Sequence, residues 1–271
     1  MCQLLAMNCN TPTDIVFSFT GFATRGGLSD EHKDGWGIAF FEGRGVRLFV
    51  DHLPACDSTV AALIKSYPVK SENVIAHIRK ATQGEVRLEN CHPFVRECWG
   101  QYWVFAHNGN LENFHPSLQG PFQPVGNTDS ELAFCLILQR LRERFGAQVP
   151  DWRELAPYLA ELCAEIAQHG TFNMTLSNGQ ALFSHCTTHL HYLIRQHPFP
   201  VARLADEEIS VDFAQVTTPN DRVAVIVTEP LTNNEAWQAY QTGDCKLFQG
   251  GSVIWQANSK KALTQPEISS A

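Results

Sequence analysis

Cys2 is the residue with the clearest potential for covalent chemistry, because it stands directly after the initiator methionine. Removal of Met1 would leave a cysteine with a free α-amine, whose reference pKa of about 7.7–8.0 makes it a base near neutral pH. A deprotonated thiol is also the best side-chain nucleophile. Cys2 could therefore supply both nucleophile and base, although a lone cysteine at this position is more often simply a buried residue.

Further polar residues lie where strands are predicted to end or helices to begin, which are the places where catalytic groups tend to be held. Each has a structural alternative. Asp129 at a predicted helix start suits the helix dipole, and Asn108-Gly109 suits a tight turn. Arg79 could be a surface ion-pair partner, and His92 an ordinary loop residue. The candidates are Arg79, Thr82, His92, Asn108, Gly109 and Asp129.

The order of these motifs resembles the class II (N-terminal nucleophile) glutamine amidotransferases, most closely the small stand-alone, YafJ-like group. Cys2 is followed in turn by His-x-Arg-x-Ala-Thr, Asn-x-His-Pro, His-Asn-Gly and Thr-Asp-Ser-Glu. The resemblance covers Cys2 to about Glu131 and extends more weakly to Gly251. One such motif alone is unspecific, but their joint order after an N-terminal cysteine favours function over the structural alternatives.

The resemblance implies a role for each candidate residue. Cys2 would attack the side-chain amide of glutamine, with its own α-amine as base. Asn108 and Gly109 would stabilise the oxyanion through a side-chain amide and a backbone N–H. Arg79 would bind the α-carboxylate of the substrate and Asp129 its α-ammonium. Two further residues, Thr82 and His92, match positions that line the same substrate pocket.

Two positions depart from the pattern of the best-known family members. Lys80 stands where those members have tryptophan, and Gln83 stands where they have histidine. Both positions shape the pocket. Glutamine and other γ-glutamyl amides therefore remain open as substrates, including γ-glutamyl peptides or metabolites.

The resemblance implies hydrolysis through a γ-glutamyl thioester with release of ammonia or an amine, and no metal or organic cofactor. The chain ends about where a glutaminase domain would, so we expect any ammonia acceptor to be a separate synthase. A catalytically silent regulatory or binding subunit that keeps the pocket is the alternative from a different functional class. The oligomeric state does not follow from the sequence.

The elements that must position these residues are predicted from capping signals and hydrophobic periodicity. Helices are expected from Thr11, with Thr11 as N-cap and Pro12 as the first helical residue, and after Ser58. A third follows the capping box Thr128-x-x-Glu131, and a fourth spans about 152–169. Short apolar strands fill the rest, including hairpins at 42–45 and at Asn178-Gly179.

This order of elements agrees with the fold that the resemblance implies: α+β, a four-layer α-β-β-α sandwich of two antiparallel sheets, the fold of the N-terminal nucleophile hydrolases. No linker or repeat interrupts the chain. We expect one domain over residues 2–258 and a loose, polar tail over 259–271.

Composition narrows the remaining function classes. The 271 residues include 44% apolar residues and carry a net charge of −8, which argues for a folded core and against nucleic-acid or membrane-surface binding. No apolar run is long enough to span a bilayer and no signal peptide is recognisable, so we expect a cytoplasmic protein. The nine cysteines form no Cys-x-x-Cys pair, and we expect packing roles for all but Cys2. His185, His189 and His191 lack a convincing further ligand, so no metal site is predicted.

Overall fold

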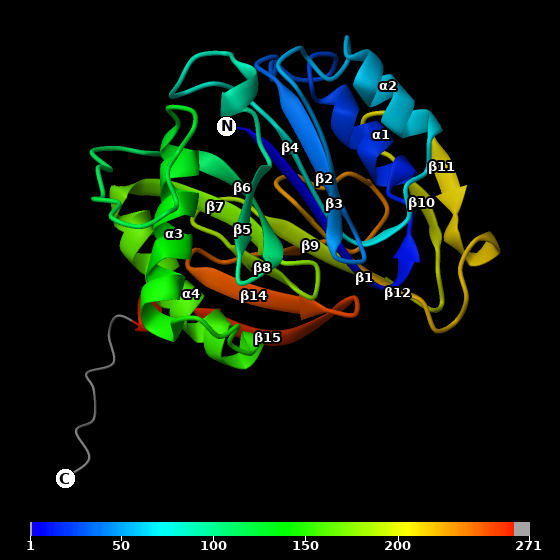
Figure 1. The fold of residues 1–271 in the computed structure, drawn as a ribbon. Coiled ribbons are helices and arrows are strands. Elements are labelled where there is room, and N and C mark those ends of the chain that lie inside the picture. The colour runs from blue at the N-terminus through cyan, green and yellow to red at the C-terminus, as the bar shows by residue number, and fades with distance from the viewer. Residues whose placement is uncertain (1, 263–271) are drawn as a thin grey trace.

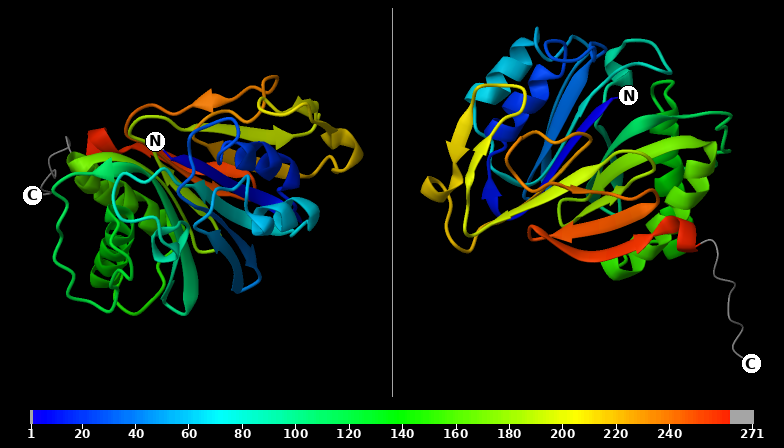
Figure 2. Two further views of the ribbon diagram at one scale, coloured as in Figure 1. Left: turned by 90° about the horizontal axis from the view of Figure 1, so that it is seen from above. Right: turned by 180° about the vertical axis from the view of Figure 1, so that it is seen from behind.

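Two antiparallel sheets lie face to face in the computed structural model, which describes residues 2–262 (Figure 1). One sheet has seven strands in the order β13-β9-β12-β1-β4-β2-β3, and the other has six in the order β15-β14-β8-β7-β6-β5. Helices cover both outer faces, as the two further views show (Figure 2). The predicted α-β-β-α sandwich is therefore confirmed.

The strands have the following bounds. The seven-stranded sheet contains β1 (Gln3–Thr13), β2 (Trp36–Glu42), β3 (Gly45–Asp51), β4 (Ser71–Ile78), β9 (His191–Gln196), β12 (Arg222–Val227) and β13 (Gln238–Ala239). The six-stranded sheet contains β5 (Phe94–Cys98), β6 (Gln101–Leu111), β7 (Gly170–Ser177), β8 (Leu182–His185), β14 (Asp244–Gln249) and β15 (Ser252–Asn258). A separate two-stranded ribbon pairs β10 (Val201–Arg203) with β11 (Ser210–Asp212).

Four of the helices pack in two pairs, one pair on each sheet. Apolar residues of α1 and α2 share a core with the seven-stranded sheet, and those of α3 and α4 share a larger core with the six-stranded sheet. The helices are α1 (Val16–Thr24), α2 (Thr59–Ser66), α3 (Asp129–Phe145), α4 (Trp152–Ile166) and α5 (Ser259–Ala262), with short 3-10 turns at Leu88–Asn90, Ala167–His169 and Phe213–Gln215.

Side-chain alternation along β1 shows how the layers are built. Leu4 and Ala6 point into the core between the sheets, whereas Leu5, Met7 and Cys9 point into the core beneath α1 and α2. Successive side chains of a strand point to opposite faces, so a central strand covered on both sides is apolar throughout. The same alternation decides which polar residues at the strand ends enter the layer between the sheets.

Helix α3 forms as its capping signals predict. The Thr128 hydroxyl accepts the backbone N–H of Glu131 at 3.2 Å, and the helix ends at Gly146, whose φ of 66° is in the left-handed region. This helix start is important because it fixes the residue that follows the cap, Asp129, at the first helical position.

The predicted start of the first helix is wrong. β1 continues to Thr13, and α1 begins only at Val16, whose N–H is bonded to the Asp14 carboxylate at 3.1 Å. Thr11 does not cap a helix, because its hydroxyl donates to Asp221 at 2.7 Å. A tertiary contact with the segment before β12 therefore overrides the local capping signal.

The region after residue 258 was predicted as a loose tail. Ser259 is buried and begins α5, with its hydroxyl 3.2 Å from Nε2 of His185. The remainder of the predicted tail, residues 263–271, lies outside the described residues.

Candidate active site

Strand alternation places several of the predicted residues in the layer between the sheets, at one end of the sandwich. Cys2 precedes Leu4 and Ala6 on the face of β1 that points into this layer, and Asn108 follows Ala106 on the corresponding face of β6. Arg79 continues the face of β4 that carries Ile75. Three residues far apart in the sequence are thereby brought to one end of one layer.

A small cavity of about 20 Å³ lies at this end. Six of the seven predicted site residues line it: Cys2, Arg79, Thr82, His92, Gly109 and Asp129. The seventh, Asn108, is not among the lining residues, because its side chain turns toward Thr228. A volume of this size holds about one water molecule, so a larger molecule can enter only if part of the lining moves.

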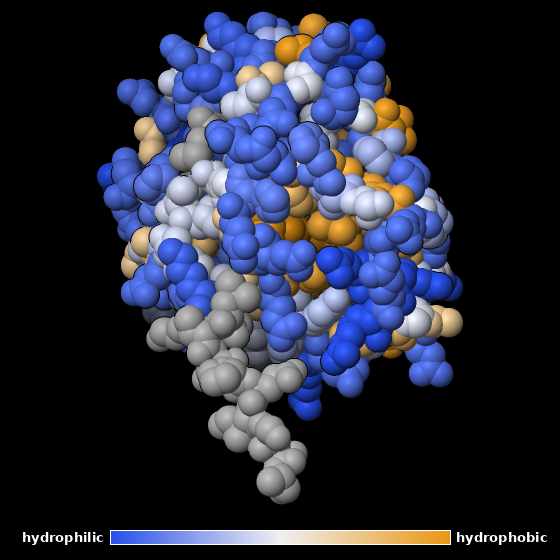
Figure 3. Space-filling view, turned by 90° about the vertical axis from the view of Figure 1, so that its left-hand side faces the viewer, coloured by the Kyte–Doolittle hydropathy of each residue, from blue (hydrophilic) through white to orange (hydrophobic). Residues whose placement is uncertain are grey.

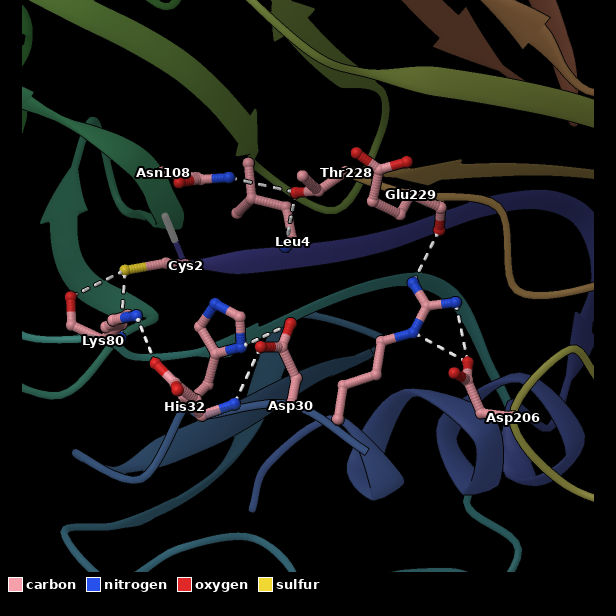
Figure 4. A network of polar contacts seen from close by, with 11 residues as sticks. Cys2, Leu4, Asp30, His32, Lys80, Asn108, Asp206, Thr228 and Glu229 are labelled. Atoms are coloured by element: carbon pink, nitrogen blue, oxygen red, sulfur yellow. Dashed lines mark hydrogen bonds and ion pairs between the residues drawn. The ribbon is translucent and has the colours of Figure 1, made fainter. Parts of the chain in front are cut away.

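The Cys2 thiol is buried and contacts the backbone of Lys80 twice (Figure 4). Its S–H donates to the Lys80 carbonyl at 3.3 Å, and the Lys80 N–H donates to Sγ at 3.2 Å. Burial raises the pKa of the Cys2 thiol, and the Lys80 hydrogen bond opposes that rise. The thiol is therefore mainly protonated at neutral pH and needs a base to become a nucleophile.

The guanidinium of Arg79 is buried and bonded only to backbone carbonyls. It donates to the carbonyls of Gln83, Gly84 and Glu85 at 2.8–3.0 Å. No carboxylate forms an ion pair with it within residues 2–262. A buried cation without a neutralising partner at a cavity wall is suited to bind an anionic group.

The Asp129 carboxylate is held at the first residue of α3. Its Oδ2 accepts the Leu111 N–H at 2.8 Å, and only 8% of the residue is exposed. Arg79 and Asp129 thus present opposite charges to the same cavity. That combination can bind a zwitterion such as the α-amino acid end of a substrate.

Gly109 is required by close backbone packing rather than by a turn, since it lies inside β6. A Cβ at this position would come within 1.8 Å of the Thr171 carbonyl oxygen on β7 and 2.4 Å of Nε2 of His107. The tight turn that was the structural alternative for Asn108-Gly109 is therefore absent, and both residues pair with β7.

Three buried histidines lie at the cavity: His92 and His107 line it, and His77 packs against His92. The rings of His77 and His92 stack with centroids 4.1 Å apart, and neither ring nitrogen of His92 has a hydrogen-bond partner within residues 2–262. Burial lowers the pKa of His77 to about 3 and that of His92 well below its usual range. His107 is bonded to Ser130 Oγ at 2.8 Å and to the Thr171 carbonyl at 3.0 Å, and burial lowers its pKa as well. All three are neutral at pH 7.

Gln83 and Lys80 are cavity-lining residues that the sequence marked only as departures from the family pattern. The Gln83 side chain donates to Asn110 Oδ1 at 2.7 Å and to the Leu111 carbonyl at 2.8 Å, which joins the segment 80–85 to the end of β6. The ammonium of Lys80 points outward and pairs with Glu31 at 3.1 Å. The segment held by Gln83 and Arg79 therefore forms part of the cavity wall.

Two of the histidines at 185–191 are each bonded to a backbone carbonyl. His185 is buried and bonded to the Phe172 carbonyl at 2.7 Å, whereas His191 is bonded to the Thr228 carbonyl at 2.9 Å. Within the described part of the chain, no group of three His, Cys, Asp or Glu residues is arranged to hold a metal ion.

A larger cavity of about 540 Å³ lies beside α3 and α4 and the segment 113–119. None of the predicted site residues lines it, and four of its polar side chains are bonded in pairs, Gln139 to Glu143 and Arg140 to Glu165. The face of the molecule seen in Figure 3 is mainly hydrophilic, with hydrophobic side chains in a central recess and in smaller groups at the top and along the right-hand edge. The predicted site residues therefore gather at the smaller cavity at Cys2 and not at the larger one.

Comparison with known proteins decides the family. The sequence profile described as "Glutamine amidotransferases class-II" matches residues 1–271. The chain belongs to the class II glutamine amidotransferases. It is 53% identical to the protein named "Putative glutamine amidotransferase" of Haemophilus influenzae, over 94% of this chain and 86% of that one. It is 50% identical to the Escherichia coli protein of the same name, YafJ, over 94% of this chain and 100% of the other.

Solved structures agree with this assignment. The crystal structure of a predicted glutamine amidotransferase from Pseudomonas aeruginosa has a TM-score of 0.76 and 47% identity, covering 94% of this chain and all of that one. The glutamine phosphoribosylpyrophosphate amidotransferase of B. subtilis shares the fold with a TM-score of 0.55 at 14% identity, over 95% of this chain and 49% of that one. No helix of this amidotransferase within residues 2–262 is long and apolar enough to cross a membrane.

Proposed function

We propose that this class II glutamine amidotransferase hydrolyses the side-chain amide of glutamine, or of another γ-glutamyl amide, through a thioester on Cys2. The observation that carries the proposal is the convergence of a buried thiol, an unneutralised Arg79 and the Asp129 carboxylate on one cavity. Arg79 binds the α-carboxylate and Asp129 the α-ammonium of the substrate, while Thr82 and His92 line the pocket.

The first half of the reaction forms the thioester. The α-amine of Cys2, free after removal of Met1, takes the thiol proton, and Sγ bonds to the amide carbon. The Asn108 side chain and the Gly109 N–H stabilise the oxyanion. The C–N bond then breaks, and the leaving nitrogen takes a proton and departs as ammonia or an amine.

The second half of the reaction restores the enzyme. Water attacks the thioester carbon, the C–S bond breaks, and the γ-carboxylate product leaves with the thiol regenerated. These steps need only groups of the chain and water. The ammonia either passes to a separate acceptor protein or is released.

Substrate entry requires motion of segment 80–85. The cavity of about 20 Å³ cannot hold a γ-glutamyl group, and the segment is closed by the contacts of Gln83 and Arg79. Position 80 carries no aromatic ring that could cover the cavity, and the Lys80 ammonium pairs with Glu31 at the surface. This arrangement supports a substrate class of γ-glutamyl amides rather than glutamine alone.

The test is a screen of γ-glutamyl amides, glutamine included, for release of ammonia or amine by the untagged protein. Cys2→Ala should abolish release. Cys9→Ala is a matched control, because Cys9 is a buried thiol on the opposite face of the same strand. Absence of turnover on every amide would refute the proposal and favour a silent binding subunit. Equal loss of activity in Cys2→Ala and Cys9→Ala would mean that both substitutions act by disturbing the fold.

A further inference from the structure

The side-chain amide of Asn108 can serve an oxyanion only if its nitrogen, not its oxygen, faces the reacting carbonyl, and this inference rests on the proposed function. Its Nδ2 donates to the Thr228 hydroxyl oxygen at 3.1 Å, while Oδ1 has no partner within residues 2–262. An amide nitrogen carries two hydrogens. One is engaged by Thr228, and the other remains available to a ligand.

The Thr228 hydroxyl also holds the strand that carries the nucleophile (Figure 4). The same oxygen accepts the Leu4 N–H at 2.9 Å, and the Thr228 N–H donates to the Leu4 carbonyl at 3.1 Å. One oxygen atom therefore links the start of β1, two residues after Cys2, to the amide of Asn108 on the opposite sheet.

Thr228 is itself fixed from several sides. Its carbonyl accepts a hydrogen bond from His191 Nδ1 at 2.9 Å. The buried guanidinium of Arg25 donates to the carbonyls of the next two residues, Glu229 and Pro230, at 2.8 and 2.6 Å. A hydroxyl on backbone held in this way has little freedom to move away from Asn108.

We propose that Thr228 is a positioning residue: its hydroxyl fixes the orientation of the Asn108 amide, so that the second hydrogen of the amide nitrogen stays available to the oxyanion. The backbone of Asn108 is held separately, because Asn173 Nδ2 donates to the Asn108 carbonyl at 3.0 Å. Loss of the hydroxyl would thus leave Asn108 in place and free only its amide to rotate. A rotated amide presents an oxygen to the oxyanion and repels it.

Steady-state kinetics on the untagged protein test the proposal. In Thr228→Val, kcat should fall about 10- to 100-fold with KM changed less than about twofold, because an oxyanion donor acts in the transition state and its full removal typically costs about 10²–10³-fold. Thr228→Ser, which keeps the hydroxyl, should restore most of kcat. The rate at which iodoacetamide alkylates Cys2 should stay near wild type, since that reaction forms no oxyanion.

Thr175→Val is the matched control. Thr175 is a fully buried threonine of the same fold whose hydroxyl has no partner within residues 2–262, so the identical change there should leave kcat unaltered. An equal fall of kcat in both valine variants, or a Thr228→Ser enzyme as slow as Thr228→Val, would overturn the proposal. Thermal melts ensure that all variants are assayed while folded.

A second measurement does not depend on turnover. In protein labelled with ¹⁵N-asparagine, the side-chain amide signals of Asn108, assigned by their loss in Asn108→Ala, should shift in Thr228→Val and return in Thr228→Ser. Unchanged signals in Thr228→Val would refute the positioning role. If the wild type hydrolyses no amide, the proposed function fails, while this measurement still decides whether Thr228 orients Asn108.

Discussion

Asp129→Asn isolates one charge of the proposed substrate pocket. The Asp129 carboxylate accepts the Leu111 N–H at 2.8 Å and is almost fully buried. Asparagine has the same shape and keeps an acceptor oxygen for that N–H, so the variant removes the negative charge without leaving Leu111 unpaired. Alanine would also remove the acceptor and leave the buried Leu111 N–H without a hydrogen-bond partner, at a cost of about 1–3 kcal/mol in stability.

The effect on catalysis should exceed the effect on stability. Loss of a charge at the first turn of a helix costs about 0.3–1 kcal/mol of folding free energy. Loss of one partner of a desolvated charge pair costs about 2–5 kcal/mol of binding free energy. At about 1.4 kcal/mol per tenfold, the latter lowers kcat/KM about thirtyfold to several thousandfold.

The assay compares two substrates in wild type and variant. Glutamine carries the α-ammonium that Asp129 is proposed to bind, whereas 4-carbamoylbutanoate has the same amide without it. Asp129→Asn should lower kcat/KM for glutamine by the factor above and leave the second substrate nearly unchanged, which is the coupling that a double-mutant cycle measures. Asp14→Asn, the same change at the exposed start of α1, is the control. Equal losses on both substrates would refute the assignment of Asp129.

Three further outcomes are expected. A glutamine-like electrophile should label the protein once, at Cys2, and not at Cys91, where burial raises the pKa of the thiol to about 11; peptide mass mapping decides, and labelling at Cys91 would contradict the nucleophile. An uncleavable N-terminal tag should remove activity by blocking the α-amine, whereas a C-terminal tag should not; equal activity, with intact mass showing Met1 still in place, would locate the base elsewhere. Stability should fall between about pH 6.5 and pH 4, because burial lowers the pKa of His77 to about 3 and of His185 to about 4, so the unfolded chain binds protons that the folded chain does not. Each histidine makes the free energy of unfolding change by about 1.4 kcal/mol per pH unit. This free energy, measured with urea at pH 7 and pH 5, should differ less between the two pH values in His77→Phe than in wild type. An unchanged difference would contradict the burial argument.

The sequence predicts the fold well where signals are local and agree with the tertiary structure. The capping box at Thr128 and the glycine at 146 define α3, and the Asn178-Gly179 turn joins β7 to β8. The first helix shows the opposite case. Its capping pattern at Thr11 is locally sound, but the Thr11 hydroxyl bonds to Asp221, 210 residues away, and no local rule anticipates such a contact.

The site is predicted to a similar extent. Motif order selects the residues that line the cavity, but not their partners, because the hydrogen bonds that hold the site join distant segments. Asn108 and Thr228 are 120 residues apart, and Leu4 and Thr228 are 224 apart. Side-chain alternation along each strand could have placed Asn108 and Thr228 in the layer between the sheets, once it was known which face of each sheet packs against the other. Their register against each other could not be read from either strand alone.

The two departures from the family pattern have different consequences for the site. The Cys2 thiol is bonded to the backbone N–H and carbonyl of Lys80, and any residue except proline at position 80 can supply those two groups. The Lys80 side chain pairs with Glu31 at the surface instead. Gln83, in contrast, uses its side chain to tie the closing segment to the end of β6. A substitution at position 80 should therefore leave the nucleophile undisturbed, whereas one at position 83 should alter how readily the cavity opens to substrate.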